Sequence, residues 1–134
     1  MKKQLTTLKQ VCEAAGVDES QYAIPETGTA KEMAAAYYSR LELYEEVFND
    51  GENCNMANPE NTRWSVWVRI TPDDSRPFGF RLSSGGYDFG NSRSALGARP
   101  EFQDKETAIY VFKTFTSDYE GWMYYYNLSK QKLQ

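Results

Sequence analysis

Three side chains in the middle of this chain are suited to binding a flat ligand: Trp67, Arg69 and Arg81. Trp67 and Arg69 are two positions apart in a stretch that alternates apolar and polar residues, so both would project from one face of a β-strand. Indole and guanidinium groups can stack on each other or on a planar ligand. Bases of single-stranded nucleic acid are such a ligand, since each stacked base contributes about 1–3 kcal/mol. An intramolecular stack of the same groups is the plainer interpretation.

Catalytic chemistry has fewer candidates. The chain contains no histidine, which removes the commonest general base and the usual partner of a serine or cysteine nucleophile. Asp73, Asp74 and Asp88, near a glycine-rich stretch, could supply a carboxylate pair, but aspartates in such positions usually form turns. We therefore predict a protein without catalytic residues.

Neither a metal nor another cofactor is predicted. The two cysteines, Cys12 and Cys54, cannot complete a tetrahedral zinc site without histidine, and free thiols in a cytosolic protein are the preferred interpretation. No window reaches about 18 uninterrupted apolar residues, so no membrane span is predicted. Polar residues interrupt the basic N-terminal segment, which argues against a secretory signal.

Charge is unevenly distributed along the sequence. The net charge is −4, with most acidic residues before position 63 and most arginines and aromatic residues after it. An acidic protein is repelled by nucleic acid unless a local basic patch acts within a Debye length of about 8–10 Å. The arginine-bearing middle is the one part that could supply such a patch.

Residues 1–50 read as a helical pair. Apolar residues at spacings of three and four over 5–15 predict a short helix that Gly16 ends. Thr29 and Glu32 form a capping box, and a longer apolar stripe follows as far as Asn49. The opposite face of this second helix is acidic and is interpreted as solvated.

The remaining sequence predicts a sheet followed by a helix. Strict alternation over 63–70 indicates a half-buried strand, and 78–82 alternates again after a turn. Gly85-Gly86 suggest a loop or a second hairpin, and a short strand at 99–102 could complete a meander. Apolar spacing then predicts a helix over 104–126. We expect a single α+β domain, 1–134, in which a small antiparallel sheet of three to four strands packs with the N-terminal helical pair and a C-terminal helix.

The end of that helix carries consecutive tyrosines, including Tyr124 and Tyr125. Successive positions of a helix point in different directions, so one buried face cannot hold them all. Exposed tyrosine surface suits contact with a partner or with a second copy of the chain. Both residues are therefore predicted binding residues.

Several short motifs occur in a fixed order along nearly the whole chain: Ala15-Gly16-Val17-Asp18, Asn49-Asp50-Gly51, Trp64 to Trp67, Phe78-Gly79-Phe80, then Gly97, Arg99 and Phe102, and finally Ala108, Tyr110, Phe115 and Tyr119. This series resembles a family of small, uncharacterised phage and prophage proteins of gut Bacteroidales. The resemblance implies a mobile-element origin and a cytoplasmic location in an infected host cell, and it brings no catalytic residue. It marks Arg99 as a residue that could either hold a loop or bind a ligand. Pro100 departs from the family pattern and predicts a distorted edge strand.

Two functions follow from these observations. The first is a non-catalytic accessory protein of a phage that binds a host or phage protein through its aromatic surface. The second is a protein that binds single-stranded nucleic acid or a nucleotide through Trp67, Arg69 and Arg81.

Overall fold

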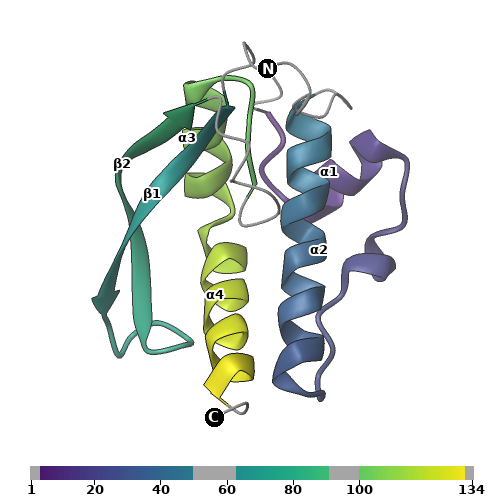
Figure 1. The fold of residues 1–134 in the computed structure, drawn as a ribbon. Helices are drawn as coiled ribbons and strands as arrows, with labels where there is room; N and C mark the ends of the chain where they lie inside the picture. The colour runs from purple at the N-terminus through teal and green to yellow at the C-terminus, as the bar shows by residue number, and fades with distance from the viewer. Residues whose placement is uncertain (1–3, 50–62, 91–99, 132–134) are drawn as a thin grey trace.

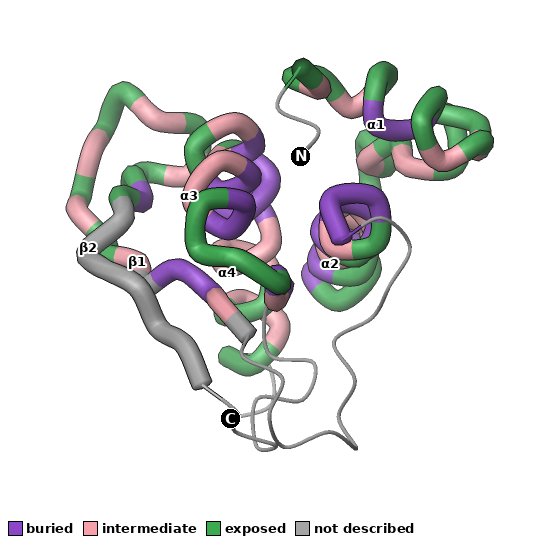
Figure 2. Tube along the Cα trace, turned by 90° about the horizontal axis from the view of Figure 1, so that it is seen from above, coloured by how far each residue is buried: buried purple, intermediate pink, exposed green. Residues whose placement is uncertain are grey.

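The computed structural model describes residues 4–49, 63–90 and 100–131, with only the backbone of 63, 67 and 84–90. Its elements form successive layers (Figures 1 and 2). A hairpin of β1 (Arg63–Pro72) and β2 (Phe80–Gly90) lies on one side, and α3 (Lys105–Thr114) with α4 (Thr116–Gln131) forms the middle. On the far side, α2 (Ala30–Phe48) is followed by α1 (Leu8–Ala15) and the short 3-10 helix η1 (Glu19–Tyr22). The mixed helix and strand composition that the sequence predicts is confirmed.

The helical pair begins and ends where the sequence indicates. Gly16 ends α1 in the left-handed conformation, at φ 71°, where a side chain would be strained. The Thr29 hydroxyl accepts the N–H of Glu32, whose side chain returns to the Thr29 backbone, so the predicted capping box of α2 is confirmed. A second capping box, between Thr7 and Gln10 at the start of α1, was not predicted.

The hairpin is closed by the turn chemistry that the sequence contains. Asp73 accepts hydrogen bonds from the backbone N–H and the hydroxyl of Ser75, and its own N–H donates to the Gly79 carbonyl. Gly79 has a φ of 84°, which glycine adopts without strain. These bonds start the antiparallel register in which Pro72 lies opposite Phe80.

The sheet is smaller than predicted and ordered differently. Gly85 and Gly86 lie within β2, and the register shifts by one residue opposite Trp67 and Val68, so the glycines mark a bulge and not a second hairpin. Within the described residues the sheet has two strands and one isolated bridge, which joins Phe102 to Trp64 of β1. A meander of three to four strands is therefore wrong, because the third segment pairs with β1 and not with β2.

Side chains of α2 hold this third segment in place. Asn49 donates to the Glu101 carbonyl and accepts the N–H of Gln103, and the Glu45 carboxylate accepts the N–H of Glu101. These bonds pair backbone groups of the segment that a neighbouring strand would otherwise pair. Burial raises the pKa of Glu45, and the Glu101 hydrogen bond opposes that rise. Glu45 is therefore half-buried and bonded, and is not part of a fully solvated acidic face.

The predicted C-terminal helix over 104–126 is two helices. Asp104 caps α3 as expected, but the backbone leaves the helical path at Phe115 and α4 begins at Thr116. The Thr116 hydroxyl donates to the Phe112 carbonyl, which α3 would otherwise leave unpaired. The break turns α4 so that it packs between the hairpin and α2 (Figure 1).

One hydrophobic core joins all of these elements. Its most deeply buried members come from both helical halves and from the segment bridged to β1: Val11, Leu41, Tyr44, Phe102, Val111 and Phe112. Tyr44 stacks on Phe115 at a centroid distance of 4.1 Å, which joins α2 to the break between α3 and α4. The position of α4 is thus fixed from both sides.

Candidate functional site

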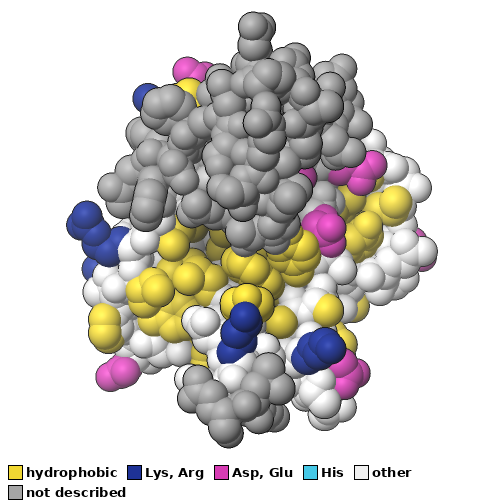
Figure 3. All heavy atoms as spheres, in the orientation of Figure 1, with side chains coloured by type: hydrophobic (Ala, Val, Ile, Leu, Met, Phe, Trp, Pro, Cys, Tyr) yellow, Lys and Arg dark blue, Asp and Glu magenta, His cyan; other side chains and the backbone are white. Residues whose placement is uncertain are grey.

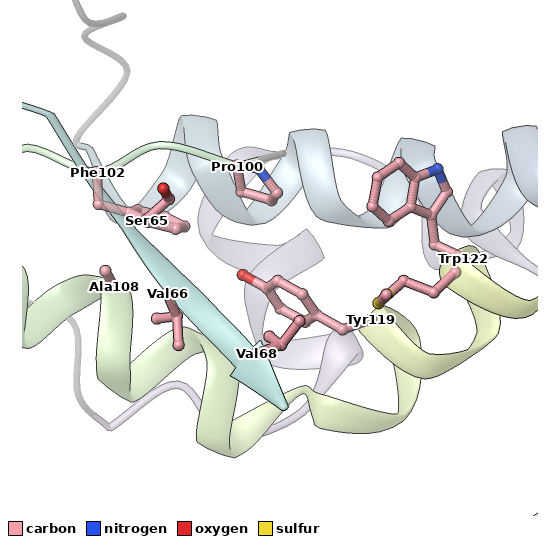
Figure 4. Close-up of a pocket in the computed structure, with 9 residues that line it drawn as sticks. Ser65, Val66, Val68, Pro100, Phe102, Ala108, Tyr119 and Trp122 are labelled. Atoms are coloured by element: carbon pink, nitrogen blue, oxygen red, sulfur yellow. The ribbon is translucent and has the colours of Figure 1, made fainter. Parts of the chain in front are cut away.

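An apolar pocket of about 140 Å³ lies between β1, the bridged segment and α4 (Figure 4). Its walls are almost entirely hydrocarbon and aromatic ring, with the Tyr119 hydroxyl among them. The lining residues are Ser65, Val66, Val68, Pro100, Phe102, Ala108, Tyr119, Trp122 and Met123. The volume is close to that of a cavity of about 150 Å³ that accepts benzene in another protein.

The local structure explains why a hollow forms here. Beyond the bridge between Trp64 and Phe102, that edge of β1 has no strand partner in the described part of the chain. Val66 and Val68 project from one face of β1 towards the helices. Tyr119, Trp122 and Met123 follow the helical spacing of α4 and form the facing wall. Space remains because the strand edge and the helix are separated there without a third strand between them.

The Tyr119 hydroxyl, which lines the pocket, has no hydrogen-bond partner among the described residues. Tyr119 is buried, with 9 % of its surface exposed. Ser65 is equally buried, but its side chain projects from the side of β1 opposite Val66. Figure 4 shows the Tyr119 ring reaching across the pocket with its hydroxyl directed towards the other lining residues. Burial raises the pKa of Tyr119, and the carboxylates of Glu45 and Asp118 raise it further, so this hydroxyl is neutral near pH 7.

The neighbours of Tyr119 on α4 are buried carboxylates with full sets of partners. Asp118 accepts from Arg40 at 3.0 Å and from the Tyr44 hydroxyl, both on α2. Glu120 accepts from Arg76 at 2.6 Å and from the N–H of Leu82 at 2.9 Å, both in the hairpin. Charged groups buried in this way tie layers together and are not free to bind a ligand.

An exposed apolar surface extends from the pocket on both sides. Ile70, two positions after Val68 and on the same side of β1, is 55 % exposed. Tyr126 is 41 % exposed and its ring lies 5.6 Å from that of Trp122. Figure 3 shows hydrophobic side chains gathered in a band across a face formed by the hairpin, α4 and α2. We call Val68, Ile70, Trp122, Met123 and Tyr126 the apolar face.

The arginine and tryptophan candidates lie elsewhere. Arg69 lies opposite Ser83, and Arg81 lies opposite Thr71, so both arginines project from the outer face of the hairpin, where both are exposed. The side chain of Arg81 is 59 % exposed and lies 4.0 Å from Asp73. The backbone of Trp67 pairs with Gly86 at the bulge, and its side chain lies outside the described residues, as does the whole of Arg99.

Tyr124 and Tyr125 are half-buried in an aromatic cluster of the chain itself. Tyr124 stacks on Phe78 of the hairpin turn at 4.9 Å, and Tyr125 stacks on Tyr37 of α2 at 6.0 Å. Gly121 permits this packing, because a Cβ there would lie 2.4 Å from the Tyr37 ring. The structure therefore does not bring the predicted tyrosines together with the predicted arginines.

Of the aspartates considered for catalysis, Asp73 stabilises the hairpin turn. Hydrogen bonds from Ser75 lower the pKa of Asp73, which fits a carboxylate that stabilises a turn. Asp74 is exposed beside it, and the side chain of Asp88 is outside the described residues. Over residues 4–49, 63–90 and 100–131, no three acidic, cysteine or histidine side chains are grouped to hold a metal ion.

The pocket itself was not predicted from the sequence. Spacing assigns Tyr119 and Trp122 to a buried stripe, and it places Ser65 on the side of β1 opposite Val66. Whether a buried hydroxyl meets a partner depends on residues far away in the chain, and no local pattern carries that information. The strongest signal present was a tyrosine in an otherwise apolar stripe.

Comparisons with known proteins give no relative: neither a family model, nor a curated protein, nor a solved structure matches this chain. Among the helices that the structure describes, none combines the length and the apolar character needed to cross a membrane.

Proposed function

We propose that this protein is a non-catalytic binding protein that engages a segment of another protein through the apolar face. One observation carries the proposal: the pocket is lined by Val68 and Trp122, and the next residues on the same sides of β1 and α4, Ile70 and Tyr126, are exposed. A pocket that accepts one side chain within a larger apolar surface is the usual arrangement at the centre of a protein interface.

The residue types support a protein partner. Aromatic residues and methionine are enriched in the buried centres of interfaces, and Trp122, Met123 and Tyr126 supply both on successive turns of α4. Lys130 lies at the border of the apolar face, 4.9 Å from the centre of the Tyr126 ring, where its ammonium group stays in water. An apolar centre with a charged rim suits a partner segment that buries one large side chain.

The source of the partner is proposed from the sequence resemblance alone. Because the motifs resemble those of phage and prophage proteins, we propose a mobile-element protein that acts in the cytoplasm of an infected cell and binds a host or phage protein. A second copy of the chain is the other occupant to be tested. No metal or organic cofactor is part of the proposal.

Selection from a random peptide library displayed on a carrier tests this function. We expect peptides selected by the wild type to share one aromatic anchor and to lose at least tenfold in affinity for the Ile70→Asp and Tyr126→Ala variants. Both changes are at exposed positions and should leave stability within about 0.5 kcal/mol. Arg81→Ala, on the outer face of the same hairpin, is the matched control and should bind normally.

Two results would contradict the proposal. One is the selection of no peptide, and the other is a set of peptides that bind wild type and both variants equally. Sedimentation velocity over a range of concentrations tests the self-association outcome. A dimer that Ile70→Asp dissociates would identify a second copy as the occupant and overturn the choice of a different protein.

Nucleic-acid binding is a second candidate, favoured by the joint exposure of Arg69 and Arg81 on one open face of the hairpin. It predicts that a single-stranded oligonucleotide binds with an affinity that falls steeply with salt, and that Arg69→Ala reduces the slope by about 0.7 on a log–log plot. Fluorescence anisotropy at several salt concentrations measures both. The position of Asp73 beside Arg81 weakens this candidate, because it lowers the local positive potential.

A further inference from the structure

We infer that the pocket takes the side chain of a tyrosine from the partner segment. This inference rests on the proposed function and names its anchor residue. Three observations support it: the volume of the pocket, the aromatic character of its walls, and the buried Tyr119 hydroxyl, which has no partner in the described part of the chain.

The volume selects a single ring. A cavity of about 150 Å³ accepts benzene, and this pocket measures about 140 Å³. A single-ring side chain therefore fits the space. Smaller aliphatic side chains would leave part of the pocket empty and lose contacts with its walls.

The walls favour an aromatic guest over an aliphatic one. Rings of Phe102, Tyr119 and Trp122 line the pocket from three directions. Aromatic pairs in offset or edge-to-face geometry contribute about 0.5–1.5 kcal/mol beyond the area that they bury. Met123 adds a polarisable sulfur, which also makes favourable contacts with ring edges.

The Tyr119 hydroxyl distinguishes tyrosine from phenylalanine. Buried polar groups in proteins are almost always hydrogen-bonded, and a ligand that cannot bond them leaves them unpaired. A phenol hydroxyl both donates and accepts, so it can accept a hydrogen bond from Tyr119 or donate one to it. A phenylalanine ring would fill the same volume and leave the Tyr119 hydroxyl without a partner.

The test uses p-cresol and toluene, which are the side-chain analogues of tyrosine and phenylalanine. Titration of the folded, full-length protein is followed by NMR through the methyl groups of Val66, Val68 and Met123 and the indole of Trp122. We expect p-cresol to shift these signals and to bind more tightly than toluene. In Tyr119→Phe the advantage of p-cresol over toluene should fall about fivefold, because one hydrogen bond is lost.

Should Tyr119→Phe fail to fold, the ratio of the p-cresol and toluene affinities in the wild type tests the inference by itself, and equal affinities would overturn it. Tyr110→Phe is the matched control, because the Tyr110 hydroxyl donates to the Leu5 carbonyl away from the pocket. The inference is overturned if p-cresol produces no shift of the pocket signals. It is equally overturned if the ratio of the two affinities is the same in wild type and Tyr119→Phe.

Failure of the inference and failure of the proposed function give different results. Selected peptides that need Ile70 and Tyr126 but gain nothing from a tyrosine would overturn the inference and leave the function standing. Pocket binding of p-cresol as expected, with no peptide selected, would support the preference for a phenol and overturn the protein partner. Replacing the anchor tyrosine of a selected peptide by phenylalanine should weaken binding about fivefold in wild type and much less in Tyr119→Phe.

Discussion

Three consecutive residues of α4 are buried and polar, yet they differ in what surrounds them. Asp118 turns towards α2 and Glu120 towards the hairpin, and each accepts hydrogen bonds from two groups. Tyr119, between them, directs its hydroxyl into the pocket and has no partner in the described part of the chain. Burial alone therefore does not distinguish a structural polar group from one available to a ligand. The presence or absence of partners does.

Two buried tyrosines give the same contrast with one residue type. The Tyr44 hydroxyl donates to Asp118, in a network that also includes Arg40. Burial raises the pKa of both tyrosines, so both hydroxyls are neutral at physiological pH. One hydroxyl holds α2 against α4, whereas the other faces an open hollow. The Tyr44 hydroxyl therefore has a structural role, whereas the Tyr119 hydroxyl is the one that we propose for binding.

The largest effect is expected from Asp118→Ala, which removes a buried carboxylate together with its hydrogen bonds to Arg40 and Tyr44. The change leaves the buried Tyr44 hydroxyl without its acceptor, and it leaves the partly buried Arg40 guanidinium with the Tyr22 carbonyl alone. We expect a loss of about 3–5 kcal/mol in the free energy of unfolding, measured by chemical denaturation. Asp74→Ala, an exposed aspartate of the hairpin turn, should change it by less than about 0.5 kcal/mol. A loss below about 1 kcal/mol for Asp118→Ala would contradict a structural role for this carboxylate.

A smaller effect is expected from Gly121→Ala, which disturbs α2 packing without entering the pocket. The added Cβ would lie 2.4 Å from the Tyr37 ring, which cannot retreat without leaving its stack on Tyr125. We expect a loss of about 1–3 kcal/mol from overpacking. In a Tyr37→Ala background the same change should cost much less, because the ring is gone. Equal losses in both backgrounds would show that this contact is not the reason for the glycine.

The smallest effect is expected for Glu45. This carboxylate is intermediate between Asp118, which has two partners, and Tyr119, which has none among the described residues, because it is half-buried and accepts one backbone hydrogen bond. Burial raises its folded pKa above the ordinary value of 4.5. The folded protein thus binds the proton more tightly than the unfolded chain, so Glu45 stabilises the fold below about pH 4.5 and this contribution is lost as pH rises through the folded pKa. The stability of wild type relative to Glu45→Gln should fall between pH 4 and 7 in denaturation experiments. A relative stability that rises with pH would show that the Glu101 hydrogen bond outweighs burial.

Local chemistry explains which parts of the fold the sequence predicts. The capping box at Thr29, the end of α1 at Gly16 and the alternation over 63–70 each depend on residues a few positions apart, and all three are present in the structure. The prediction of a loop or turn at Gly85 and Gly86 was wrong, because both glycines lie within β2 at a bulge. A bulge depends on the partner strand, which local sequence does not contain.

Long-range contacts explain what the sequence could not predict. The break at Phe115 and the bridge between Phe102 and Trp64 follow from how the helices pack on the hairpin. The candidate site was missed for the same reason. Spacing identified Tyr119 as a buried residue, but the partner of a hydroxyl is set by whichever segment folds against it. The exposure of Arg69 and Arg81 could be predicted, because the alternation of each strand places them on the face opposite the apolar residues.

The central claim is that the Tyr119 hydroxyl is free for a ligand, and a matched pair of variants tests it most directly. Chemical denaturation of Tyr44→Phe should show a loss of about 1.5–3 kcal/mol, because a hydrogen bond to a buried carboxylate is removed. Tyr119→Phe should leave the free energy of unfolding within about 0.5 kcal/mol of wild type, because no hydrogen bond is lost. A loss for Tyr119→Phe as large as that for Tyr44→Phe would contradict the account, since it would mean that the pocket hydroxyl already has a partner within the chain.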